Sequence, residues 1–167
     1  YGDQIVVMTT PMIGNYGVNA EDPESSRPQV AGVIVRELTE HPSNWRADGD
    51  LRSWLRDAQV PLLEEVDTRR LTRHLRSAGV MRGVIGHGDM PSGATMAALA
   101  ACPSMEGLDL ASRASTREAY TWGDESAPSH IVAYDYGSKR NSLRLFADHD
   151  CHVTGVPADT PASAVLE

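Results

Sequence analysis

The residues of this chain best suited to anion chemistry lie in the stretch 134–140, Tyr-Asp-Tyr-Gly-Ser-Lys-Arg. Gly137 allows a tight turn there, and Lys139 and Arg140 open a predicted helix. Backbone N–H groups and the helix dipole attract anions at such a place. The second glycine and the Gly-Lys-Ser/Thr ending of a phosphate-binding loop are missing. The alternatives are therefore a phosphate site or a turn whose charged residues are solvated.

A second group of residues that can ligate metals is His149-Asp150-Cys151-His152. Its spacing fits no common zinc pattern. Cys151 and His152 would also point to opposite faces of a strand. We predict no metal site here and expect Cys151 to be a buried residue that opens a strand.

Three arginines, Arg69, Arg73 and Arg76, are spaced at i, i+4 and i+7, so they share one face of a predicted helix. Such a face can contact an acidic partner or can be solvated, as most charged side chains are. The sequence leaves both interpretations open.

No nucleophile can be assigned. Neither Cys102 nor Cys151 lies in the Gly-x-Cys-x-Gly turn that exposes a catalytic thiol, and no histidine or carboxylate can be paired with either by spacing. From the residues alone, the sequence offers no complete catalytic constellation, and no cofactor-binding or metal-binding residue is assigned. Two cysteines are also too few for a disulfide scaffold, which favours a reducing, cytoplasmic location.

The end of the chain has the pattern of a βαβ unit. An apolar run at 131–133 precedes a helical pattern containing Leu143, Leu145 and Phe146, and a second apolar run follows at 153–156. This order is typical of the start of a parallel α/β domain, whose sheet needs further strands and covering helices.

The earlier part predicts a mixed α/β domain. Asp50 and Asp67 are expected to cap helices, Gly79 to end the second one, and Ser92 to cap a third. Residues 119–129 lack apolar periodicity and are interpreted as a linker. The predicted domains are therefore 1–118 and 130–167. The predicted strands of the first domain are 4–9, 31–38 and 81–85, and its predicted helices are 51–58, 67–78 and 92–101.

Composition excludes some functions. The 167 residues carry a net charge of −8, so nonspecific nucleic-acid binding is not expected. No apolar run approaches the roughly 20 residues of a membrane span, so no membrane partner is expected. Because the sequence begins at Tyr1 without a methionine, we expect that residues precede it.

Three long stretches, in order, resemble the small, glutamine-hydrolysing subunit of carbamoyl phosphate synthetase. A shorter match, Ser-Met-Glu-Gly-Leu-Asp-Leu, lies at 104–110, and the resemblance covers essentially all 167 residues. The three stretches are 4–19 (Gln-Ile-Val-Val-Met-Thr-Thr-Pro-Met-Ile-Gly-Asn-Tyr-Gly-Val-Asn), 66–85 (with Asp-Thr-Arg-Arg-Leu-Thr-Arg at 67–73) and 132–160 (with Tyr-Asp-Tyr-Gly-Ser-Lys-Arg-Asn at 134–141).

The resemblance implies an N-terminal small-subunit domain, then a flavodoxin-like, class I glutamine amidotransferase domain with a Cys-His-Glu triad. It implies hydrolysis of glutamine to glutamate and ammonia. The ammonia would pass to a large subunit, which uses ATP and Mg to make carbamoyl phosphate for arginine and pyrimidine synthesis. The implied partners are that large subunit, as a heterodimer, and glutamine.

Carried over residue by residue, the resemblance places no triad residue within 1–167. Cys102 and Cys151 match non-catalytic positions, so the chain alone is expected to be inactive. Asp150 replaces a usual glycine, a change that should cost little because Asp tolerates the left-handed conformation. Thr10 and Met12 are further departures at non-catalytic positions. The alternative is a non-catalytic module that binds an anion or docks to a partner.

Overall fold

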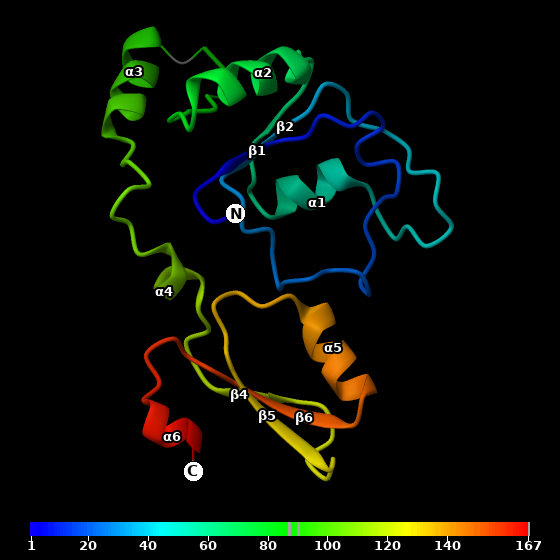
Figure 1. Cartoon of the computed structure of the whole chain (residues 1–167). Helices are drawn as coiled ribbons and strands as arrows, with labels where there is room; N and C mark the ends of the chain where they lie inside the picture. The colour runs from blue at the N-terminus through cyan, green and yellow to red at the C-terminus, as the bar shows by residue number, and fades with distance from the viewer. Residues whose placement is uncertain (87, 90, 167) are drawn as a thin grey trace. The chain divides into compact units, whose positions relative to one another are not determined.

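The computed structural model describes residues 1–86, 88–89 and 91–166, which form two compact units. Unit 1 comprises Tyr1–Asp22 and Arg27–Leu108. Unit 2 comprises Pro23–Ser26 and Asp109–Glu167, of which Glu167 itself lies outside the described residues. Each unit contains helices and parallel strands (Figure 1), so the predicted α/β class is confirmed.

Unit 1 is built on a small parallel sheet. Its strands are β1 (Ile5–Val7), β2 (Gly32–Ile34) and β3 (Leu62–Leu63), in the order β1-β2-β3. In the register, Val33 of β2 lies between Val6 and Leu62. The first two strands lie inside the predicted runs. The third has two residues, too few to show a period-two pattern.

The first two helices of unit 1 begin where the sequence predicts them. The carboxylate of Asp50 accepts a hydrogen bond from the N–H of Ser53 at 2.8 Å, and Asp67 accepts one from Arg70 at 2.9 Å. Gly79 follows the second helix with a φ of 84°. These caps are confirmed, because each depends only on residues one turn away. The three helices are α1 (Leu51–Asp57), α2 (Thr68–Ala78) and α3 (Ser92–Ala101).

The core of unit 1 joins the sheet to α1. Val35, just after β2, is fully buried, and Leu55 of α1 is 2% exposed. Burying one such side chain contributes about 1.5–3 kcal/mol. The buried core residues of this unit are Ile13, Val33, Val35, Leu38, Leu55 and Val60.

Unit 2 contains the predicted βαβ arrangement. Strands β5 (Ser129–Tyr134) and β6 (Cys151–Val156) are parallel neighbours joined through α5 (Arg140–Asp148) (Figure 1). Helix α5 packs on β6 and on β4 (Tyr120–Trp122), and its Leu143 is buried. The sheet order is β4-β6-β5, with β4 antiparallel to β6. The elements of unit 2 are α4 (Leu110–Ala114), β4 (Tyr120–Trp122), β5 (Ser129–Tyr134), α5 (Arg140–Asp148), β6 (Cys151–Val156) and α6 (Ala162–Leu166).

Three local predictions are wrong. The predicted linker 119–129 contains β4, because a three-residue strand shows no periodicity even though Tyr and Trp favour strands. Residues 81–85 form no strand, since Gly83 weakens that short run. Pro91, not Ser92, is the residue before α3, and no side chain caps that helix. The domain limits 1–118 and 130–167 remain a prediction.

The substituted glycine position behaves as expected. Asp150 has a φ of 54°, in the left-handed region that Asp tolerates better than most residues. The turn between α5 and β6 therefore keeps its path without a glycine. Separately, none of the helices in the described part of the chain is both long enough and apolar enough to span a bilayer.

We expect Leu55→Ala to lower the free energy of unfolding of unit 1 by about 3 kcal/mol, because it opens a cavity in the core. Urea denaturation followed by circular dichroism measures this. Leu63→Ala is the matched control, since Leu63 is 41% exposed and should cost much less. Equal losses in the two variants would contradict the core described above.

Candidate functional site

The turn between β5 and α5 is held by the carboxylate of Asp135. One oxygen accepts hydrogen bonds from the backbone N–H groups of Gly137 at 2.8 Å and Ser138 at 2.7 Å. An Asp side chain used in this way replaces a backbone turn. Gly137 has a φ of 95°, which favours glycine. The sequence Asp-Tyr-Gly-Ser thus sets the shape of the turn locally.

The second oxygen of Asp135 joins the turn to β4. It accepts a hydrogen bond from the hydroxyl of Tyr120 at 2.7 Å. The Tyr120 ring lies against Gly155 of β6, where an added Cβ would come within 2.3 Å of a ring carbon. Glycine at 155 therefore makes the room that the tyrosine occupies.

The electrostatics of this pair are set by burial and by hydrogen bonds. Burial and the neighbouring carboxylate raise the pKa of Tyr120 to about 12. Burial acts to raise the pKa of Asp135 as well, but the hydrogen bonds from Ser138, Tyr120 and Gly137 outweigh it and hold that pKa below its ordinary value. At neutral pH the pair is therefore a carboxylate and a neutral phenol.

The N-terminus of α5 is satisfied by Glu24, in the segment Pro23–Ser26 of the same unit. Its backbone carbonyl accepts from the N–H of Arg140 at 3.1 Å, and its carboxylate accepts from the N–H of Asn141 at 2.8 Å. A negative side chain at a helix N-terminus is favoured by the dipole. Glu24 thus occupies the position that an external anion would take.

These contacts decide between the two interpretations of the stretch 134–140. The N–H groups of Gly137, Ser138, Arg140 and Asn141 all donate to carboxylate or carbonyl oxygens of the chain itself. A phosphate would have to displace them. The geometry therefore favours a structural turn, with Lys139 exposed beside it, over an anion-binding site.

Residues 149–152, whose side chains could ligate a metal, do not come together as a metal site. The Cys151 thiol donates to the carbonyl of His149 at 3.4 Å and is partly buried at the start of β6, rather than fully buried as predicted. His152 instead faces His130 on β5, with ring centroids 5.0 Å apart. Among the described residues, no group of three or more His, Cys, Asp or Glu side chains could hold a metal ion.

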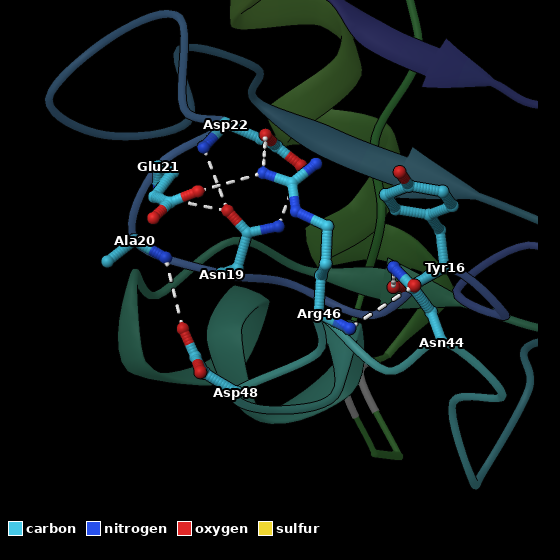
Figure 2. A network of polar contacts seen from close by, with 8 residues as sticks. All are labelled: Tyr16, Asn19, Ala20, Glu21, Asp22, Asn44, Arg46 and Asp48. Carbon is cyan, nitrogen blue, oxygen red and sulfur yellow. Dashed lines mark hydrogen bonds and ion pairs between the residues drawn. The ribbon is translucent and has the colours of Figure 1, made fainter.

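A polar network in unit 1 fixes the loop that leads to Asp22 (Figure 2). The guanidinium of Arg46 contacts Glu21 at 3.0 Å and Asp22 at 2.8 Å, and Asn19 donates to Asp22 at 2.7 Å. Hydrogen bonds to Glu21 and Asp22 raise the pKa of Arg46 above its already high value. Asp48 accepts from the backbone of this loop at 3.3 Å. Because the side chains of this network bond to one another and to the loop backbone, we interpret the network as structural: it fixes the conformation of the loop.

The sequence predicts Asp135 and Gly137 only as parts of a turn and does not indicate three other contributors to these networks. Tyr120 lies in the predicted linker, and no local pattern assigns a role to Glu24 or Arg46. Glu24 lies 117 residues from Asn141 in the chain, so no local pattern could pair them. The predicted arginines of α2 are all exposed and lie far along the chain from this turn.

The fold defines a class of protein: an α/β chain of two units, the first built on a small parallel sheet and the second containing a parallel β-α-β crossover. A family model described as carbamoyl-phosphate synthase small chain, CPSase domain, matches residues 1–85. The chain belongs to the carbamoyl phosphate synthase small chain family.

Curated relatives extend the similarity over the whole chain. The carbamoyl phosphate synthase small chain of Thioalkalivibrio sulfidiphilus is 42% identical over 179 residues, covering 99% of this chain and 47% of its own length. That of Escherichia coli K12 is 40% identical over 183 residues, covering 100% and 48%. That of a Synechococcus strain is 42% identical over 178 residues, covering 99% and 46%. The chain thus spans about half the length of the curated relatives it matches.

Tyr120→Phe tests the bond to Asp135. Because the pKa of Tyr120 is raised from 10.0 to about 12 on folding, its contribution to stability is complete below pH 10 and is lost as the pH rises towards 12. We expect wild type to be more stable than the variant by about 1 kcal/mol at neutral pH, a modest value because the site is partly exposed. Urea denaturation at several pH values should show this difference shrinking above pH 10.

Tyr136→Phe is the matched control, since Tyr136 is 52% exposed. Because its side chain is largely exposed, we expect this substitution to change the stability at neutral pH by much less than Tyr120→Phe does. A constant difference for Tyr120→Phe across the alkaline range would show that the hydroxyl does not pair with Asp135.

Glu24→Ala should free the N–H of Asn141 at the start of α5. We expect its hydrogen exchange to accelerate by about two- to fivefold, the size of a lost helix-terminal charge interaction. Amide exchange measured by NMR tests this, with exposed Glu125→Ala as the control that leaves Asn141 unchanged. Identical exchange of the Asn141 amide in both variants would show that Glu24 does not protect it.

Proposed function

We propose that this chain is part of the glutamine-hydrolysing small subunit of carbamoyl phosphate synthase. The observation that carries this proposal is its 40–42% identity to carbamoyl phosphate synthase small chains over 99–100% of its length. In this role the subunit releases ammonia from glutamine. A large subunit combines the ammonia with bicarbonate, using ATP and Mg, to give carbamoyl phosphate for arginine and pyrimidine synthesis in the cytoplasm.

We propose that residues 1–118 form the N-terminal domain of that subunit, and that 130–167 begin its flavodoxin-like amidotransferase domain. The parallel β5-α5-β6 crossover supports this. So does α5, on which Leu145 is 51% and Phe146 is 41% exposed. Helices of parallel α/β domains are ordinarily covered on their apolar sides, so further elements would bury these residues.

We propose that none of the Cys-His-Glu triad lies in this chain. Both cysteines are partly buried free thiols. Their hydrogen bonds go to backbone carbonyls, from Cys102 to Pro103 and from Cys151 to His149. A nucleophilic cysteine instead needs a base within hydrogen-bond reach. The contribution of the chain would then be assembly with the large subunit rather than chemistry.

A second candidate function, an anion-binding module, has less support, because the turn at 134–140 already pairs its N–H groups with Asp135 and Glu24. The docking alternative is compatible with the main proposal. It is favoured by the charge distribution on α2, where four arginines lie exposed on one short helix.

The purified chain should release no glutamate from glutamine above background. The complete small chain of Escherichia coli, assayed in parallel, is the positive control. Cys102→Ser and Cys151→Ser should change nothing. Glutamate release from the wild-type chain that is abolished by either serine variant would place the nucleophile here and overturn the assignment.

A further inference from the structure

Helix α2 concentrates positive charge on a chain that is acidic overall. The full chain has a net charge of −8, yet the 11 residues of α2 include no acidic residue. All of its basic side chains are exposed. We call its four arginines the basic face of α2: Arg69, Arg70, Arg73 and Arg76.

No arginine of the basic face has an ion-pair partner among the described residues. Arg46 pairs with Glu21, Arg52 with Glu64 and Arg56 with Asp57, whereas no arginine of α2 forms an ion pair within the described part of the chain. Asp67, the nearest acid in the sequence, accepts from the Arg70 backbone as the helix cap. Arginines at i, i+4 spacing on one helix repel each other. Carboxylates from outside would relieve that repulsion.

The orientation of this face is fixed by the opposite side of the helix. Thr68 is 3% exposed, and Leu71 and Leu75 are partly buried. Rotating the basic face inward would expose these residues. The outward side chains border an open hollow of about 500 Å³, whose lining residues are Asp67, Arg69, Arg70, Arg73, His74 and Ser77.

Apolar side chains continue the surface beyond the end of the helix. Val80 is 89% exposed and Met81 is 51% exposed, directly after Gly79. Arginine and methionine are enriched in protein interfaces, whereas a merely solvated helix end needs no exposed valine and methionine beside it. This composition favours a protein partner.

We propose that the basic face of α2, with Val80 and Met81, is a docking surface for an acidic patch on the large subunit of the synthase. This rests on the proposed function, which supplies that partner. Arginine suits the contact because its fork pairs with carboxylates in a bidentate manner.

Two other ligand classes fit the surface less well. A nucleic acid would be repelled by the net charge of −8 of the whole chain, and no Phe, Tyr or Trp is among the described residues that line the hollow for base stacking. A small anion would need an enclosed site, but every arginine of the basic face is exposed. A protein surface can cover such a broad, open area.

The test is binding of the chain to the purified large subunit, by calorimetry, at low and at moderate salt. Arg69→Glu combined with Arg73→Glu should weaken binding by about tenfold or more at low salt and reduce its salt dependence. The control is Arg36→Glu combined with Arg117→Glu, which makes the same charge change at two exposed arginines outside α2. Circular dichroism melting checks that each variant folds. If the glutamate pair melts early, Arg69→Gln with Arg73→Gln replaces it.

The outcomes separate this inference from the proposed function. Weaker binding by the α2 variant alone supports the docking surface. Normal binding by that variant, or equal weakening by the control, overturns it while the proposed function stands. A wild-type chain that does not bind the large subunit overturns both. Comparable affinity for duplex DNA that is lost in the α2 variant would reassign the surface to nucleic acid.

Discussion

The carboxylate of Asp135 is the interaction on which unit 2 depends. A partly buried carboxylate is costly unless its oxygens are hydrogen-bonded, and this one has three donors. Through them it ties a three-residue strand, β4, to the turn that starts α5. Tyr120 can reach it only because position 155 is glycine. One acidic side chain thus links a strand, a turn and a helix that share few other contacts.

The hydrogen bonds accepted by Asp135 and Glu24 also explain why the geometry disfavours a ligand site at this turn. Asp135 and Glu24 supply the negative oxygens that a phosphate would otherwise bring to the helix N-terminus. The N–H groups at this turn and helix N-terminus are therefore paired within unit 2. Unmatched positive charge lies instead on α2 of unit 1, where no described carboxylate pairs with the arginines.

The sequence predicts what is local. Asp50 and Asp67 were found as caps because a cap and its partner lie three residues apart. The β-α-β order follows from two apolar runs, 131–133 and 153–156, with a helical pattern between them. β3 and β4 were missed because two or three residues carry no period. The pairing of Asp135 with Tyr120 and of Glu24 with Asn141 could not be predicted, since these residues lie 15 and 117 positions apart and meet only through tertiary packing.

The most direct test of this account is an NMR titration of the chain with inorganic phosphate, following the backbone amides at the turn and at the start of α5. We predict no saturable shift of the Gly137, Ser138, Arg140 and Asn141 signals, because their hydrogen bonds are already made within the chain. Saturating shifts confined to these four amides at about millimolar phosphate or below would show that the turn is a ligand site and would contradict the account.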